Sequence, residues 1–352
     1  MPTVLYALNA ALQNALASDE RVVIMGEDIL DPYGGAFKVT RGLSDSFPDR
    51  VITTPISEAG IVGIAAGMAL RGLLPVVEIM FGDFITLIAD QVINHAAKFR
   101  WMYNDQVRVP IVIRTPMGGR RGYGPTHSQT MEKFFIGVPG LRVLAPNTFS
   151  DPGDLLSKAI FEDNDPVLFI ENKLLYLNTI HDSNRLSEFE FFEQIPEPNF
   201  YHHSKHNGTI ADLSNNYAPT CMLSLRDAPP PVLTIAAYGY ISEFAYQAAL
   251  NLAYEYEVFT ELVYPTQLSP CDMGAILSST KRTGRLLVVE EGTHNLGWGA
   301  EVIAQTAENL GSRLLSARRI AALNLPIPAS GPLEEAVLPG IEHIIQAAQK
   351  MV

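Results

Sequence analysis

A glutamate at the start of an apolar, glycine-spaced segment is the first residue whose type and position could do chemistry. Glu58 follows the segment TPIS at 54–57 and precedes a run rich in alanine and glycine. A carboxylate at the start of a helix stabilises its positive end, and Ser57 could cap that helix. Alternatively, Glu58 projects from a buried element into a cleft and shares a proton with a ligand nitrogen. The local sequence leaves both interpretations open.

A histidine in a glycine-rich loop is the second candidate. His127 follows four glycines within residues 118–124 and precedes a segment that can begin a helix. On a rigid α/β scaffold, a loop histidine suits acid–base catalysis or the stabilisation of a developing negative charge. In the alternative interpretation, Thr126 or Ser128 caps the next helix and His127 has no chemical role.

Two neighbouring cations, Arg120 and Arg121, lie in the same loop. They could bind the carboxylate or phosphate of a substrate through charge-assisted hydrogen bonds. The plainer interpretation is a solvated loop or a contact with an acidic partner. Sequence alone does not separate these possibilities.

The composition is that of a globular protein and narrows the function classes. Of 352 residues, 47% are hydrophobic and 18% charged, so the chain can bury a sizeable core. The net charge of 25 − 38 = −13 argues against binding to nucleic acid or to anionic membranes. Two cysteines, Cys221 and Cys271, exclude a disulfide framework and a zinc site of cysteines alone. No targeting segment is visible, so a cytoplasmic location is expected.

Common catalytic motifs give no match. The sequence lacks a GxxxxGK(S/T), an HExxH and a GxSxG pattern, and the glycines at 118–124 lack the GxGxxG spacing of a dinucleotide site. The histidines at 202, 203 and 206 could suggest a metal site. Their loop context, without a nearby cysteine, favours a solvated connection instead.

The elements that must position these residues alternate between helix and strand over residues 1–175. The strands are continuously apolar, which predicts a parallel sheet with helices on both faces. We expect strands at residues 22–25, 75–80, 110–114, 141–145 and 166–170, and helices at residues 4–16, 61–70, 83–102 and 151–161.

The alternation stops and then resumes. Residues 176–229 read as an irregular connecting segment, which leads into three consecutive prolines at 229–231. Residues 230–352 predict a second, smaller α/β domain. Its expected strands are at residues 232–236, 258–263, 285–289 and 316–320, and its helices are at residues 242–254, 297–309 and 341–350.

Several ordered motifs together resemble one family. They are MGED at 25–28, TPISEAG at 54–60, HSQ at 127–129, VPGL at 138–141, YGY at 238–240, TQLSP at 266–270, VVEE at 288–291 and PLEEAVLP at 332–339. This pattern resembles the β subunit of the thiamine-diphosphate-dependent 2-oxo acid dehydrogenases, which act on pyruvate, branched-chain 2-oxo acids or acetoin. The resemblance implies a two-domain transketolase-like α/β fold. It makes residues 1–175 the pyrimidine-binding domain and residues 230–352 the transketolase-like C-terminal domain.

The resemblance also implies roles for individual residues. Glu58 matches the glutamate that hydrogen-bonds a ring nitrogen of the aminopyrimidine of thiamine diphosphate, and Phe84 matches the aromatic residue that packs on this ring. Met80 and Ile56 match neighbouring cofactor contacts, although both could be plain core residues. His127 matches the histidine that faces the substrate and the incoming lipoyl group.

An absent motif implies a partner. Thiamine enzymes hold the diphosphate through a divalent metal on a GDG motif, and this chain contains no GDG. In the resembled family that motif lies on a separate α subunit, which binds the magnesium. The resemblance therefore implies a shared active site in an α2β2 assembly, with a lipoyl-bearing acyltransferase as the next component.

Other positions depart from the family pattern. The segment 159–166 resembles a structural potassium loop but is one residue longer, so a potassium ion near Ala159, Ile160 and Asp163 is only an option. The connection at 176–229 is longer than the family suggests. Two other functions therefore stay open beside a pyruvate dehydrogenase-like subunit. One is a thiamine-dependent acyl or ketol transferase of biosynthesis, and the other is a non-catalytic assembly subunit.

Overall fold

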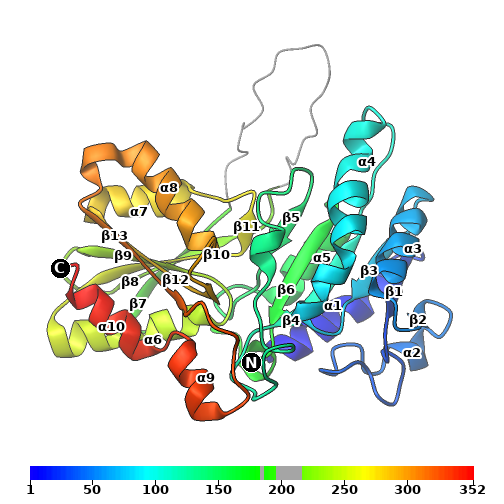
Figure 1. Cartoon of the computed structure of the whole chain (residues 1–352), viewed down its shortest axis with the longest axis horizontal. Helices are drawn as coiled ribbons and strands as arrows, with labels where there is room; N and C mark the ends of the chain where they lie inside the picture. The colour runs from blue at the N-terminus through cyan, green and yellow to red at the C-terminus, as the bar shows by residue number, and fades with distance from the viewer. Residues whose placement is uncertain (183–185, 196–215) are drawn as a thin grey trace.

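The computed structural model describes residues 1–182, 186–195 and 216–352, which form two helix-flanked sheets side by side (Figure 1). The first sheet has the strand order β11-β5-β6-β4-β3-β1-β2. Neighbouring strands are parallel except for β11, which runs antiparallel to β5. The strands are β1 (Val22–Gly26), β2 (Val51–Thr53), β3 (Leu74–Glu78), β4 (Val112–Met117), β5 (Arg142–Leu144), β6 (Val167–Asn172) and β11 (Gln267–Ser269).

Helices cover both faces of this sheet because its strands are apolar on both sides. Along β1, Val22 and Ile24 pack with α1 (Val4–Ser18) and α5 (Pro152–Phe161). The alternate residues Val23 and Met25 pack with α3 (Glu58–Leu70). The shorter elements of this half are α2 (Leu43–Ser46), η3 (Glu132–Phe134) and η4 (Leu175–Leu177).

The single helix predicted at 83–102 is in fact three consecutive helical segments of different types. A 3-10 helix, η1 (Gly82–Ile88), leads into a π-helix, η2 (Gln91–Ala96), and then into α4 (Ala97–Met102). Residues 85, 88, 92 and 96 all face the core. Because spacings of three and four residues are common to all three helix types, the apolar period could not distinguish them.

The second sheet has the order β13-β12-β9-β10-β8-β7. Four of its strands are parallel, while β8 runs antiparallel to β10 and β7 antiparallel to β8. The strands are β7 (Phe189–Gln194), β8 (Thr220–Leu225), β9 (Leu233–Ala237), β10 (Thr260–Pro265), β12 (Arg285–Thr293) and β13 (Ser316–Ala322). The helices are α6 (Ile241–Tyr256), α7 (Gly274–Thr283), α8 (Trp298–Leu310), η6 (Gly311–Arg313), α9 (Gly331–Val337) and α10 (Ile341–Gln349).

The irregular connection predicted at 176–229 was wrong in part, because β7 and β8 fall inside it. β7 is an outer strand of the second sheet and pairs with β8, and β7 buries little besides Phe189. An outer strand of this kind carries no continuous apolar run, which is the signal that revealed the parallel strands. The histidines at 202, 203 and 206 lie outside the described residues.

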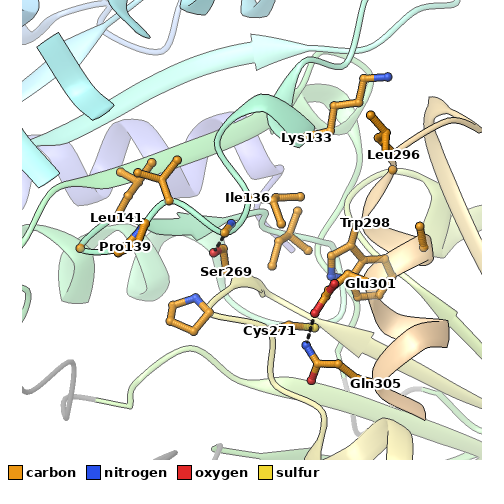
Figure 2. Close-up of a pocket in the computed structure, with 17 residues that line it drawn as sticks. Lys133, Ile136, Pro139, Leu141, Ser269, Cys271, Leu296, Trp298, Glu301 and Gln305 are labelled. Carbon is orange, nitrogen blue, oxygen red and sulfur yellow. Dashed lines mark hydrogen bonds between the residues drawn. The ribbon is translucent and has the colours of Figure 1, made fainter. Parts of the chain in front are cut away.

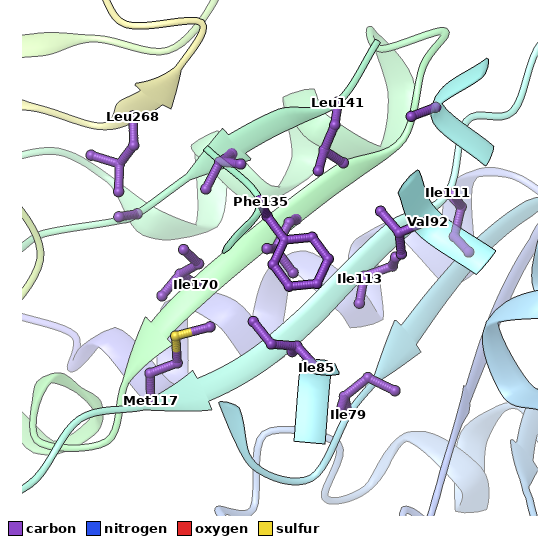
Figure 3. Close-up of a cluster of buried hydrophobic side chains, with 14 of the residues drawn as sticks. Ile79, Ile85, Val92, Ile111, Ile113, Met117, Phe135, Leu141, Ile170 and Leu268 are labelled. Carbon is purple, nitrogen blue, oxygen red and sulfur yellow. The ribbon is translucent and has the colours of Figure 1, made fainter. Parts of the chain in front are cut away.

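One hydrophobic core joins the two halves. It extends from Ile113 on β4 to Trp298 on α8, and Phe135 is among its fully buried side chains. Figure 3 shows Phe135 among Ile113, Ile170 and residues from the neighbouring strands, with Leu268 at the edge toward the second half. The pairing of β11 with β5 adds main-chain hydrogen bonds across the same boundary. Within the described part of the chain, no helix combines the length and the apolar character that a bilayer crossing requires.

Candidate active site

The predicted site residues gather where neighbouring parallel strands end. In the order β2-β1-β3-β4-β6, these strands are followed by Glu58, Glu27, the 79–88 segment, the 118–129 loop and Lys173. The carboxyl ends of parallel strands share one edge of the sheet, and ligands of α/β proteins bind in the crevice there. The topology thus brings residues distant in sequence to a common edge.

An aromatic group surrounds His127 at this edge. Its imidazole centroid lies 4.8 Å from that of Phe81 and 5.4 Å from that of Phe84, with both rings in edge-to-face orientation. The Thr126 hydroxyl lies 3.0 Å from His127 Nδ1. The structure therefore places Phe84 and His127, two residues picked from the sequence, beside each other.

Glu58 is the first residue of α3, and its side chain is buried. Ser57 is the N-cap residue of α3, as the sequence suggested, but its side chain makes no capping hydrogen bond. A second carboxyl, Glu27, accepts a hydrogen bond from the Ser57 main chain. Burial raises the pKa of Glu27, and the nearby charges of Glu58 and Asp28 add to this effect.

Sequence reasoning missed Glu27 as a site residue. It directly follows the buried strand β1, and its Oε1 atom is buried without a hydrogen-bond partner among the described residues. A buried, unpaired carboxyl oxygen is costly unless a ligand or another chain satisfies it. Its place at the end of a parallel strand was the signal that could have identified it.

The two apolar contacts taken from the resemblance differ in exposure. Ile56 is 83% exposed, whereas Met80 is half-buried beyond the end of β3. Leu87, on η1, is also exposed. Ile56 is therefore not a core residue of this chain, and its side chain is free to be covered by a ligand or by another subunit.

Arg120, a predicted substrate-binding residue, already has protein partners for its side chain. Arg120 Nη1 donates to Glu291 Oε2 at 2.9 Å, and its Nη2 donates to the main-chain carbonyl of Pro339. The guanidinium also lies over the ring of Phe244, 4.9 Å from its centroid. Arg120 thus binds the loop to the second half of the chain.

Arg121 has a different environment. Its side chain is exposed, and its guanidinium carbon lies 5.9 Å from the ring centroids of both Phe37 and Tyr123. Both rings belong to the aromatic group, since Phe37 and Tyr123 each contact Phe81 edge to face. Arg121 therefore lies at the rim of the candidate site with its charge accessible to a ligand.

Two carboxylates from the second half of the chain hold the glycine-rich loop. Glu291 Oε1 accepts the main-chain N–H of Gly119 at 2.6 Å, and Glu334 Oε1 accepts that of Arg120 at 2.6 Å. Glu334 Oε2 also accepts the N–H of Gly122 at 3.2 Å. A glycine is required at 118, where φ is +96° and an added Cβ would lie 2.4 Å from Asn172 Nδ2.

In the candidate potassium loop, the two aspartates form ion pairs with arginines of this chain. The Asp163 carboxylate accepts from Arg142 Nε at 3.1 Å and from the hydroxyl of Tyr217, and burial raises its pKa to about 6. Asp165 pairs with Arg100 at 2.8 Å. Ala159 and Ile160 are buried on α5. Within the described ranges, no group of three or more His, Cys, Asp or Glu side chains could hold a metal ion.

A pocket of about 550 Å³ lies elsewhere, between the 133–141 segment, the 268–271 segment and α8. Figure 2 shows Ser269, Cys271 and Trp298 along its wall, with Lys133 and Leu296 at one end. Residues of the VPGL and TQLSP motifs line it, but none of the candidate catalytic or cofactor-binding residues does. Its shape therefore carries no argument for the chemistry at the sheet edge.

Comparison with known families agrees with this architecture. The model for the transketolase pyrimidine-binding domain matches residues 1–178, and that for the transketolase C-terminal domain matches residues 225–344. A solved structure described as a split-gene transketolase, an inactive beta4 tetramer, has a TM-score of 0.72 at 17% identity. The match covers 100% of this chain and 98% of that one. At this identity the similarity shows the fold, and it confirms the predicted two-domain transketolase-like α/β architecture.

Several named proteins are similar in sequence to nearly the whole length of this chain. The pyruvate dehydrogenase E1 component subunit beta-1, mitochondrial, of Arabidopsis thaliana is 36% identical over 350 residues, covering 99% of this chain and 88% of that protein. The acetoin:2,6-dichlorophenolindophenol oxidoreductase subunit beta of Cupriavidus necator is 33% identical over 354 residues, covering 98% and 95%. The chain belongs to the transketolase-like family of β subunits of thiamine-diphosphate-dependent 2-oxo acid dehydrogenases.

Proposed function

We propose that this chain supplies the pyrimidine-binding half of an active site that decarboxylates a small 2-oxo acid such as pyruvate and passes the acyl group to a lipoyl carrier. The observation that carries the proposal is the arrangement at the sheet edge. The buried carboxyls of Glu58 and Glu27 follow β2 and β1, and the Phe84–His127 pair follows β3 and β4.

The residues present fit the aminopyrimidine of thiamine diphosphate. The half-buried ring of Phe84 offers a packing surface, and the adjacent carboxyl pair offers an unsatisfied buried oxygen for a polar ring atom. When bound, this cofactor supplies the carbon nucleophile and the electron sink for decarboxylation.

Each residue then has a defined task. Glu58 offers its carboxyl to a pyrimidine ring nitrogen, and the raised pKa of the nearby Glu27 favours a proton on that second carboxyl. Phe84 orients the ring. His127, beside Phe84, holds or moves a proton at an imidazole nitrogen near the substrate and stabilises developing charge. Arg121 attracts the substrate carboxylate from the rim.

We further propose that an α subunit completes the site and carries the diphosphate and its magnesium, in an α2β2 assembly. Helix α3 supports this proposal because its outward residues are apolar. Gly63, Ile64, Gly67 and Leu70 are exposed, and nothing lies within 4 Å of a Cβ built at Gly67. The exposed residues Ile56 and Leu87 are further apolar surface near the site. Exposed apolar surface beside small residues is suited to cover by another subunit.

The test is reconstitution with the candidate α subunit and a panel of 2-oxo acids. Decarboxylation is followed with an artificial electron acceptor, and acyl transfer with a lipoyl domain. We expect activity only in the pair, and its loss in Glu58→Ala and His127→Ala. The matched controls are Glu335→Ala, an exposed glutamate on α9, and His95→Ala, a histidine that contacts Phe99. Activity that survives Glu58→Ala would point to a non-catalytic assembly role.

The same assay tests the second function. Cofactor-dependent turnover with an aldehyde or ketone acceptor, and none with a lipoyl domain, would show a biosynthetic acyl or ketol transferase. We retain this transferase as a second candidate function because the fold is similar to that of a split-gene transketolase.

We propose a cytoplasmic location for the assembled enzyme. Both cysteines are free, which suits a reducing compartment. Several named relatives are mitochondrial proteins, so fractionation of cells that express the tagged chain is the required test.

A further inference from the structure

A buried lysine lies directly beneath the candidate active-site loop. Lys173 follows the last residue of β6, and its side chain is 0% exposed. Its ammonium donates a hydrogen bond to the main-chain carbonyl of His127. The same nitrogen lies 5.3 Å from the ring centroid of Phe81 and 5.4 Å from that of Tyr123. Lys173 therefore contacts the histidine and two members of the surrounding aromatic group.

Burying the ammonium group of Lys173 is energetically unfavourable. One neutral carbonyl and two ring faces replace only part of the hydration that Lys173 loses. Burial accordingly lowers the pKa of Lys173 to about 8, with Arg121 adding to this effect and the carboxylates of Asp83, Glu291 and Glu334 opposing it. A methionine, the apolar residue nearest to lysine in shape, would fill most of the space without this cost.

An aspartate holds the same loop two residues further on. Asp83 Oδ1 accepts the main-chain N–H of Gln129 at 3.3 Å and its side-chain Nε2 at 2.9 Å. The other oxygen of Asp83 is buried and has no hydrogen-bond partner among the described residues. The main chain on both sides of Ser128 is thus fixed by a cation from β6 and an anion from the segment after β3.

We propose that Lys173, together with Asp83, is a positioning residue that fixes the His127 imidazole for its work at the substrate. The hydrogen bond to the His127 carbonyl sets the place of its main chain, and the contact of both residues with Phe81 sets the direction of the ring. Small displacements of a catalytic side chain have large effects on rate. The catalytic part of this inference rests on the proposed role of His127, whereas the hold on the loop does not.

Hydrogen exchange of the main chain tests the hold without any turnover. In Lys173→Met we expect the amides of residues 123–130 to exchange about tenfold faster than in the wild type, because a charged hydrogen bond is lost. Lys158→Met, which removes a half-buried lysine from the pair with Asp154 on α5, should leave this segment unchanged. Unchanged exchange at 123–130 in Lys173→Met would overturn the proposal.

A double-mutant cycle in the reconstituted enzyme tests the link to His127. If Lys173 acts through His127, Lys173→Met lowers kcat in the wild type but has little further effect in His127→Ala. Losses that multiply in the double variant would overturn the positioning role. If His127→Ala itself has no effect on activity, the proposed function fails while the exchange result still stands.

If Lys173→Met does not fold, hydrogen exchange in a second variant and in the wild type still tests the proposal. Asp83→Ala should also speed exchange at residues 127–130, because it removes both hydrogen bonds to Gln129. In the wild type, protection of the same segment, corrected for intrinsic rates, should fall as pH rises through about 8, where Lys173 loses its charge. Protection that is insensitive to Asp83→Ala and to this pH change would contradict the proposal.

Discussion

Arg120 in the glycine-rich loop donates a 2.9 Å hydrogen bond from Nη1 to Oε2 of Glu291, which lies 171 residues further along the chain. Glu291 is near the end of β12 in the second sheet, and its other oxygen accepts the N–H of Gly119. The loop that carries His127 is therefore anchored to the C-terminal half. This contact makes the second half part of the active-site geometry.

Arg120→Ala should lower kcat, about tenfold, with little change in the KM for the 2-oxo acid, since loss of this partly buried anchor loosens the loop and leaves substrate binding intact. Steady-state kinetics of the reconstituted pair measure both constants. Glu291→Gln, which keeps one acceptor oxygen, should have a smaller effect. A large rise in KM with unchanged kcat would restore Arg120 to a substrate-binding role.

Arg121→Ala should show the opposite pattern. Its exposed guanidinium at the rim of the aromatic group is free to attract a carboxylate, so its removal should raise KM about tenfold and leave kcat nearly unchanged. The effect should shrink at high ionic strength, because salt screens an exposed charge. The matched control is Arg41→Ala, which removes another exposed arginine of the same half of the chain. Equal KM values for the Arg121 and Arg41 variants would exclude the role.

The parallel cores of both sheets could be predicted from the sequence, because strands buried on both faces leave continuous apolar runs. The first five strands were expected within a few residues of β1, β3, β4, β5 and β6. Edge strands such as β7 bury one face and leave only a weak pattern. The short strand β11 owes its place to pairing across the two halves, which no local pattern encodes.

The candidate site divides in the same way. Glu58 and His127 could be selected because each has an unusual local setting and a family motif around it. Lys173 has neither, and Glu27 lies in the MGED motif but has no unusual neighbours in sequence; the importance of both comes from partners that only folding brings near. The anchoring contact of Arg120 could not be predicted for the same reason, since its carboxylate partner is in the other half of the chain. Local sequence thus identifies side chains that could take part in chemistry, while tertiary contacts decide which of them are available to a ligand.

A buried carboxyl at the boundary between the halves predicts a pH-dependent stability. Burial, with the nearby charge of Glu132, raises the pKa of Glu290 from the ordinary 4.5 to about 8. Between these values the folded chain holds a proton that the unfolded chain has lost. The stabilising contribution is therefore fully present below pH 4.5 and is lost as pH rises through about 8.

Glu290→Gln should remove this dependence, because an amide does not ionise. Urea unfolding of the isolated chain at several values between pH 5.5 and about 8.5 measures it, and a single group contributes at most about 1.4 kcal/mol per pH unit. The difference in slope between the variant and the wild type isolates Glu290 from other titrating groups. Glu308→Gln, an exposed glutamate on α8, serves as the control. Identical slopes in the wild type and Glu290→Gln would contradict the assignment.

The central strands of the first sheet contain a buried charge network that should dominate the response to one substitution. Arg114 on β4 donates to both oxygens of Glu171 on β6 at 2.8 Å and to Glu78 on β3 at 2.9 Å. Arg114→Met fills similar space but leaves two buried carboxylates without their cation. Removing one partner of such a pair costs roughly 3–5 kcal/mol.

The matched control is Arg21→Met, which breaks the exposed pair with Asp19 and should cost little stability, because exposed ion pairs contribute little. Denaturant unfolding of both variants gives the comparison. Adding Glu171→Gln and Glu78→Gln to Arg114→Met should recover part of the lost stability, because neutral amides are cheaper to bury than unpaired carboxylates. If Arg114→Met were no more damaging than Arg21→Met, the network would not be a stabilising feature of the sheet. A large loss with recovery in the triple variant would show that the cost lies in the abandoned carboxylates rather than in altered packing.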